Sequence, residues 1–225
     1  MSGAVSFVIP VLNEQGAVAT LLQDLRERYP DSELIVVDGG SNDQTVALAM
    51  PLCDQLLMGE AGRAAQMNLG GQLARGPYLF FLHADSRPTI SAAALEEVIR
   101  SNPQWGFSRI RLGGEAFAYR VIEWFINHRS RLTSIGTGDQ MLFLQQSLFD
   151  SCGGFDAIPL MEDVALCKRL RESCAPLILT QQVVTSTRRW ERGGIARTVL
   201  RMWALRFAYY FGASPQTLHR HYYGQ

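Results

Sequence analysis

Lysine is nearly absent from this chain of 225 residues, because Lys168 is the single lysine among 21 basic side chains. Schiff-base chemistry therefore has almost no candidate residue. Cysteine is scarce as well, and its four positions show neither the CxxC spacing of a zinc site nor the density of a disulfide scaffold. We expect Cys53, Cys152, Cys167 and Cys174 to be reduced core residues.

Long apolar runs are missing too. None approaches the roughly 20 residues that cross a bilayer, and the first 13 residues lack the basic start of a signal peptide and are typical of a strand. We therefore expect a cytoplasmic protein. Hydrophobic residues at 47% and charged residues at 19% are ordinary for a globular chain of one large domain.

The formal net charge is zero, so the chain lacks the global positive field that attracts nucleic acid, and we expect no nucleic-acid partner. The charge is uneven, however: residues 1–187 carry 14 cations and 20 anions, whereas residues 188–225 carry seven arginines and one acid. In the predicted terminal helix Arg206 points away from Arg197, so a clean basic face is missing. Contact of this tail with the inner face of a membrane stays open.

Strands and helices alternate over the first 100 residues, which predicts a parallel sheet covered by helices on both faces. The expected strands are Val5–Ile9, Leu34–Val37, Leu56–Met58 and Tyr78–Leu82, and the expected helices are Ala17–Tyr29, Ser41–Met50 and Arg63–Ala74. The second of these helices is expected to open with a capping box at residues 41–44.

The second half breaks this alternation and predicts a mixed topology. Its expected strands are Phe107–Leu112, Met141–Leu144, Leu177–Thr180 and Val183–Thr187, and its expected helices are Glu115–Leu132, Glu162–Ser173 and Gly194–Phe211. Between Phe117 and Ile126 the polar residues lie on one stripe and apolar ones surround the rest. This pattern favours a buried helix over one that dips into a membrane interface.

Polar residues follow three of the predicted parallel strands, at the edge of the sheet where ligands bind in such folds. They are the groups Pro10 to Glu14, Asp38 to Ser41, and His83 to Asp85. The first turn has no GxGxxG and carries Glu14, which would repel a pyrophosphate, so a dinucleotide dehydrogenase is disfavoured. A P-loop motif is absent. Asp38 suits a nucleoside, because a carboxylate accepts from a base N–H or ribose hydroxyls.

Asp85 supplies a hard oxygen for Mg²⁺ or Mn²⁺, ions that take one or two carboxylates and let substrate phosphates complete the shell. His83 is either a second ligand or a hydrogen-bonding residue. Arg63 opens a helix where it could touch a phosphate or a base. Glu162 and Asp163 also open a helix, as ordinary N-terminal acids or as the base that accepts a proton from an acceptor hydroxyl.

These motifs together resemble one known family. PVLNE, VVDGGSND, FFLHAD, GGF followed by MED, and RRW occur in the order seen in family 2 glycosyltransferases of the GT-A fold. The segments HAD, GDQ, PLMEDVAL and TSTRRWERGG are similar to a bacterial subgroup associated with arsenosugar biosynthesis. The resemblance implies a Rossmann-like, mostly parallel GT-A domain over residues 1–190, with a nucleotide-binding half (1–100) and an acceptor and catalytic half (101–190). A basic and aromatic helical extension follows over residues 191–225.

The resemblance also implies roles. Asp163 would be the catalytic base supported by Glu162, and Asp85, with His83 in doubt, would hold the Mn²⁺ or Mg²⁺. The nucleotide-sugar pocket would comprise Pro10, Asn13, Glu14, Asp38, Gly39, Ser41, Arg63 and Asp85, and the acceptor side would comprise Gly138, Asp139, Arg189 and Trp190. The implied reaction moves a sugar, of the hexosyl type, from a nucleoside diphosphate to an acceptor hydroxyl with inversion. The rival hypotheses are a nucleotidyltransferase and a nucleotide-sugar binding or assembly protein without turnover.

Overall fold

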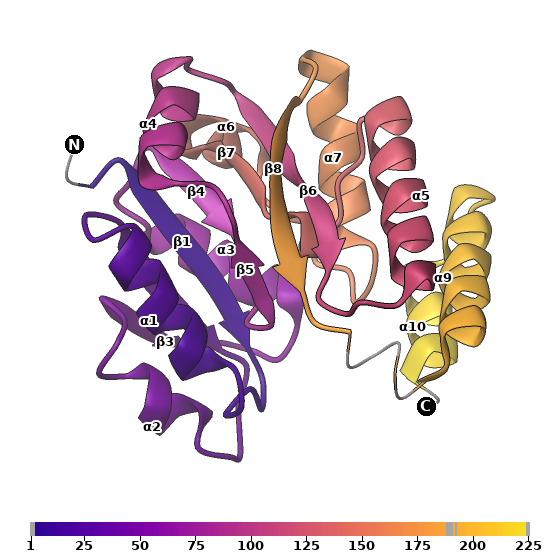
Figure 1. Cartoon of the computed structure of the whole chain (residues 1–225), viewed down its shortest axis with the longest axis horizontal. Helices are drawn as coiled ribbons and strands as arrows, with labels where there is room; N and C mark the ends of the chain where they lie inside the picture. The colour runs from indigo at the N-terminus through magenta and orange to yellow at the C-terminus, as the bar shows by residue number, and fades with distance from the viewer. Residues whose placement is uncertain (1–2, 188–190, 192, 224–225) are drawn as a thin grey trace.

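A single eight-stranded sheet forms the centre of the molecule (Figure 1) in the computed structural model, which describes residues 3–187, 191 and 193–223. The strand order is β3-β2-β1-β4-β7-β6-β8-β5. The strands are β1 (Val5–Val11), β2 (Glu33–Asp38), β3 (Gln55–Met58), β4 (Tyr78–Phe81), β5 (Ser86–Pro88), β6 (Trp105–Leu112), β7 (Leu142–Gln145) and β8 (Leu177–Thr185).

Helices cover both faces of this sheet. Their bounds are α1 (Val18–Arg28), α2 (Thr45–Ala49), α3 (Arg63–Leu73), α4 (Ala92–Arg100), α5 (Phe117–Thr133), α6 (Gln146–Cys152), α7 (Glu162–Ser173), α9 (Ile195–Tyr210) and α10 (Pro215–Tyr223), with a 3-10 turn η1 (Gly138–Gln140). One core joins the sheet to α1, α2 and α4, and the other joins it to α3, α6 and α7. Along β1, Phe7 and Ile9 enter the first core and Val8 the second, as the alternation of a strand requires.

The predicted parallel half is confirmed. Strands β3, β2, β1 and β4 run parallel to one another, and their nearly continuous apolar sequence fits a sheet that is buried on both faces. The second half is mixed, as expected, because β7 is antiparallel to both β4 and β6 while β8 is parallel to β6.

Several details of the fold differ from the sequence prediction. The two strands expected after residue 176 form one strand, β8. Its pairing with β6 shifts register between Ser108 and Arg109 and leaves the polar residues Thr180 and Gln181 out of the ladder, so the apolar pattern is interrupted within a single strand. Strand β5 and helices α4, α6 and α10 were not expected. The capping box at residues 41–44 is wrong: α2 begins at Thr45, because Ser41 and Asp43 bond to the neighbouring loop instead.

Helix α5 packs its polar stripe inward, against the edge of β6. Asn127 bonds both the N–H and the carbonyl of Ile110 at 2.9 Å, Glu123 accepts from the N–H of Leu112, and Arg120 donates to the carbonyl of Leu112 at 2.7 Å. β6 pairs with β7 only at Trp105 and Gly106, so this edge would otherwise leave backbone groups unpaired.

The expectation that the apolar residues of α5 are buried is therefore wrong for the face of the helix that carries its aromatic residues. Phe117 is 81% exposed, and Trp124 and Phe125 are about half exposed. At the same end of the sheet α9 and α10 lie beside α5 (Figure 1). The four thiols are free, and of these Cys167 is buried as expected while the other three are half-buried. Within the described ranges, no helix is both long and apolar enough to pass through a bilayer.

We predict that Gly106→Ala destabilises the protein by roughly 2 to 3 kcal/mol in urea unfolding, because overpacking of a tight interior is costly. A Cβ at Gly106 would stand 2.0 Å from the carbonyl oxygen of Leu177 and 2.5 Å from the ring of Phe143, between β7 and β8. Gly16→Ala, where a Cβ meets nothing within 4 Å, is the matched control. Equal unfolding midpoints for the two variants would contradict this packing.

Candidate active site

Hydrogen bonds join the loops that follow β1 and β2. The N–H of Asn13, a residue in the left-handed region at φ 57°, donates to the hydroxyl of Ser41 at 2.8 Å, and the side chain of Asn13 accepts from the N–H of Asn42 at 2.9 Å. The N–H of Glu14 donates to the hydroxyl of Thr45 at 2.7 Å. The structure thus brings Asn13, Glu14 and Ser41 to one edge of the sheet.

Asp38, the last residue of β2, fixes the loop that follows this strand. It is fully buried, and its Oδ2 accepts from the N–H groups of Gly40 and Ser41 at 2.8 Å each. Its Oδ1 is buried without a hydrogen-bond partner among the described residues. A buried acceptor that lacks a donor is costly, so this oxygen is suited to an N–H or O–H from a ligand.

A residue that the sequence analysis missed, Gln66 of α3, links the ends of the two strands. Its Nε2 donates to the carbonyls of Val11 and Val37 at 2.8 and 2.7 Å. A Cβ at Gly39 would lie 3.0 Å from this side chain, so the glycine lets the loop approach it closely. In the sequence, the signal for Gln66 was an amide side chain on the buried face of a helix, one turn after Arg63.

Pro10 lies inside β1, opposite Val37, and is buried. Proline has no N–H to donate to a central ladder. It is tolerated here because β4 pairs with β1 only as far as Val8 and then turns away toward His83 and Asp85. The two strands therefore separate at the edge where the polar loops gather.

His83 contacts the turn η1, which lies far along the chain. Its Nδ1 lies 3.2 Å from Oδ1 of Asp139, and its buried Nε2 has no hydrogen-bond partner among the described residues. A Cβ at Gly138 would be 2.5 Å from the imidazole ring, so only glycine allows this contact. The Nδ1 contact gives His83 a hydrogen-bonding role, and its role as a metal ligand stays a prediction.

Asp163 lies at the first turn of α7 and is fixed by two backbone donors. Its Oδ2 accepts from the N–H of Gly138 and its Oδ1 from the N–H of Val164, both at 2.7 Å. A carboxylate has about four lone-pair positions, so the side chain keeps capacity for a further donor. The residue before this helix, Met161, is held at φ 70°, a conformation that is costly for a side chain with a Cβ.

Burial raises the pKa of Asp163, and the charge of Asp139 adds to the rise, while the bonds from Gly138 and Val164 and the charge of Arg63 oppose it. Burial also raises the pKa of Glu162, and the charge of Asp163 raises it further. Two neighbouring carboxylates of this kind titrate as a pair. A raised pKa makes a carboxylate a better proton acceptor near neutral pH.

Two cavities adjoin each other in this region, and the smaller one contains the pair Glu162 and Asp163. A small one of about 80 Å³ is lined by Arg63, His83, Glu162 and Asp163, and helices α9 and α10 close it with Leu205, Arg206 and Tyr222. A larger one of about 780 Å³ contains Asp85. Both are lined by Thr137, Asp139, Met202 and Arg206.

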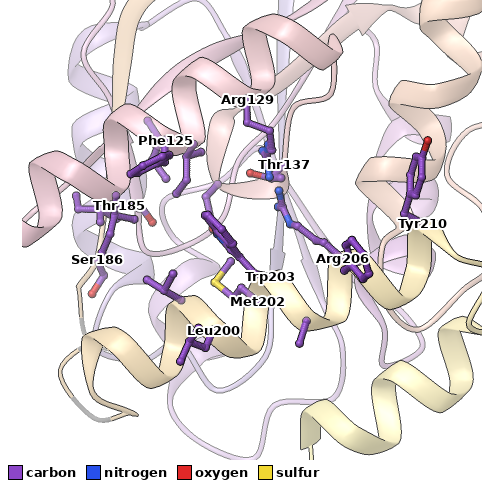
Figure 2. Close-up of a pocket in the computed structure, with 18 of the residues that line it drawn as sticks. Phe125, Arg129, Thr137, Thr185, Ser186, Leu200, Met202, Trp203, Arg206 and Tyr210 are labelled. Carbon is purple, nitrogen blue, oxygen red and sulfur yellow. The ribbon is translucent and has the colours of Figure 1, made fainter.

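Figure 2 shows Arg129 of α5 and Arg206 of α9 reaching toward the same point beside Thr137. The Nε of Arg129 is buried without a hydrogen-bond partner among the described residues. Neither arginine was predicted as a site residue. The signal for Arg206 was its place on the helix face opposite Arg197.

A divalent ion fits the carboxylates that are present. No group of three or more histidine, cysteine, aspartate or glutamate residues is arranged to hold a metal in the part of the chain that the structure describes. Mg²⁺ and Mn²⁺ need only one or two carboxylates when substrate phosphates supply the other ligands. Asp85 and Asp139 line the same cavity and would be those carboxylates. The predicted acceptor residues Arg189 and Trp190 lie outside the described residues.

Residues 6–157 match the family model for Glycosyl transferase family 2. The chain belongs to this family. The curated relatives include the PGL/p-HBAD biosynthesis glycosyltransferases of Mycobacterium bovis and Mycobacterium tuberculosis, each 36% identical over 88 residues, or 36% of this chain and 34% of the relative. The chain therefore matches about a third of their length. The arsenosugar-associated subgroup stays a prediction, because no comparison tests it.

Solved structures give the same fold. The mannosyltransferase PcManGT from Pyrobaculum calidifontis, in complex with GDP-Man and Mn²⁺, aligns with a TM-score of 0.66 at 17% identity, over 92% of this chain and 61% of that one. S. aureus TarS 1–349 in complex with UDP aligns with a TM-score of 0.62 at 14% identity, over 83% and 60%. The predicted GT-A fold of a glycosyltransferase is thus confirmed.

We predict that Glu162→Gln raises the melting temperature at pH 8 and leaves it nearly unchanged at pH 4.5. A carboxyl whose pKa is raised by folding favours the native state while it is protonated, and loses that contribution as the pH rises from the unfolded to the folded pKa. Glutamine has no such dependence. Thermal melts of both proteins across this range test the sign.

Glu97→Gln, which replaces an exposed carboxyl on α4, serves as the control for the loss of a carboxyl group as such. A Glu162→Gln melting difference that is larger at pH 4.5 than at pH 8 would contradict the assigned direction.

Proposed function

We propose that this glycosyltransferase is a metal-dependent, inverting enzyme that transfers a sugar from a nucleoside diphosphate to an acceptor hydroxyl, with Asp163 as the base. The observation that carries the proposal is the position of Asp163: a carboxylate with raised pKa, fixed by Gly138 and Val164, in a cavity that adjoins the one lined by Asp85.

The nucleoside is assigned to the edge formed by the loops after β1 and β2. The buried Oδ1 of Asp38 accepts from the base or the ribose, and the bonds from Gly40 and Ser41 hold the carboxylate in place for this contact. The neighbours of the same fold contain UDP, UDP-GlcNAc or GDP-Man, which supports a nucleotide sugar as the donor.

The diphosphate is assigned to the region between this edge and Asp163. A bound Mn²⁺ or Mg²⁺ on Asp85 and Asp139 would supply positive charge for the departing diphosphate. Arg63, at the first position of α3, adds a fixed cation whose field lowers the pKa of both Glu162 and Asp163 and so reaches their cavity. Positive charge that is already in position where the negative charge of the leaving group develops is usually the largest contribution of such a site to the rate.

The transfer is a single displacement. The acceptor oxygen forms a bond to the anomeric carbon while the bond from that carbon to the phosphate oxygen breaks, and the nucleoside diphosphate leaves with the electron pair. The acceptor proton passes to Asp163. No covalent sugar intermediate forms, so the configuration at the anomeric carbon inverts.

Asp163→Asn is expected to lower turnover by about 100-fold or more, the usual contribution of a general base. Binding of the nucleotide sugar should change little, because the asparagine keeps one side-chain oxygen that can accept from the N–H of Gly138 or Val164 and so preserves the local structure. Steady-state kinetics together with a donor-induced thermal shift separate the two effects. Asp150→Asn, an exposed position on α6, is the control, and wild-type turnover in Asp163→Asn would reject this base.

We also expect one of the UDP-, GDP- or TDP-sugars to raise the melting temperature, more so with Mn²⁺, because a ligand that binds only the folded state stabilises it. Asp85→Asn should abolish the Mn²⁺-dependent part of the shift, and the exposed Asp31→Asn should retain it. A panel in which no donor shifts the melting temperature of the wild type would contradict the nucleotide-sugar assignment.

A further inference from the structure

An apolar groove lies between α5 and α9 and accounts for the larger cavity of about 780 Å³. Phe125 of α5 and Trp203 of α9 meet in it with ring centroids 6.1 Å apart, although each ring is about half exposed. Ile110 and Leu112 of β6 line its buried side. Exposed apolar surface of this extent marks a binding site more often than it marks ordinary protein surface.

The groove adjoins the candidate catalytic residues. Thr137, Asp139, Met202 and Arg206 line both the groove and the small cavity that holds Asp163, so the two spaces are direct neighbours. A molecule that fills the groove has one end beside Asp139 and Arg206 and therefore within the region of the proposed base. The rest of that molecule lies among aliphatic and aromatic side chains.

The size and lining of the groove define the chemistry of its occupant. A volume of about 780 Å³ falls within the roughly 300 to 1,000 Å³ of pockets that enclose a ligand of drug size. Its lining is mainly apolar, with charged side chains from Asp85, Arg129, Asp139 and Arg206. A fully hydrophilic acceptor would leave these apolar walls in contact with water and gain nothing from them.

We propose that this groove binds the apolar body of an amphiphilic acceptor and presents the acceptor's hydroxyl group to Asp163. The proposal rests on the glycosyl transfer proposed above and names the class of acceptor for it. Phe125 and Trp203 bind the apolar body, and Thr137 and Arg206 lie where the polar end begins (Figure 2).

A membrane surface fits these observations less well than a single molecule does. Exposure of aromatic side chains does not distinguish the two, because Phe117 at 81% and Phe211 at 69% exposed lie outside the groove whereas Tyr210 at 77% lines it, so the shape of the surface decides. The groove is concave and adjoins the site, as a pocket for one acceptor molecule must.

The test compares two probes with the same hydroxyl groups. We expect n-octyl β-D-glucoside, kept below micelle formation, to bind the full chain at least about 100-fold more tightly than methyl β-D-glucoside, because each buried CH₂ contributes about 0.8 kcal/mol. Isothermal titration measures both affinities. Equal affinities of the two probes would overturn the proposal.

A matched pair of tryptophans locates the binding. Trp203→Ala should weaken octyl glucoside binding by roughly tenfold, the effect of losing one large apolar contact. Trp124→Ala should change it little: Trp124 is 58% exposed against 59% for Trp203 and also contacts Phe125, yet it lines a different cavity. Ala204→Phe, which fills the groove rather than emptying it, should also weaken binding.

The remaining outcomes separate the hypotheses. Equal losses of octyl glucoside affinity in Trp203→Ala and Trp124→Ala would mean that the probe binds exposed apolar surface in general, and this would overturn the proposal. Phosphatidylglycerol vesicles that bind the chain while octyl glucoside does not would favour a membrane surface and overturn it as well. The donor-induced thermal shift is measured in parallel: its persistence in Trp203→Ala shows a folded donor site, and its absence in the wild type would count against the proposed function alone.

Discussion

The pairing of α5 with the free edge of β6 is the interaction on which the second half of the molecule depends. Beyond Gly106 no strand among the described residues pairs with this edge, and side chains of α5 take its place, with Asn127 bonding to Ile110 and Glu123 to Leu112. Because buried backbone groups must be paired, the polar face of α5 is committed to the sheet. Its aromatic face must then turn away from the sheet, and this gives the wall against which α9 packs.

The same edge of β6 fixes η1, the turn that contacts the proposed base. Gln140 of η1 donates to the carbonyl of Ser108, and its Oε1 accepts from Thr137 and Ser130. With Gln140 anchored, the preceding Gly138 is held where its N–H reaches Asp163. The residue after the turn, Met141, is forced to φ 45°, a strain that the surrounding hydrogen bonds must offset. The scaffold and the proposed base are thus joined through one short segment.

The sequence predicts the parallel half of the sheet and its polar edge well because the signals are local. Strands buried on both faces appear as continuous apolar runs, and polar groups after them mark the edge of the sheet, so the positions of Asp38 and Asp85 follow from order alone. The second half depends on pairings across the chain. Nothing near Glu123 says that a polar stripe will face inward, and nothing near Gln66 says that it bridges two strands, since both bonds need the folded sheet.

The two sides of the site also differ in how they are built, and this bears on specificity. The proposed donor edge is held by hydrogen bonds between side chains and the main chain, such as those of Asp38 and Gln66, so substitution of these residues disturbs the loops themselves. The groove is lined by side chains such as Phe125 and Trp203, which protrude from helices whose polar contacts lie elsewhere. Such residues can be exchanged without loss of the backbone network. In the proposed assignment, a change of acceptor therefore requires few substitutions on α5 and α9, whereas a change of nucleotide requires the sheet edge to be rebuilt.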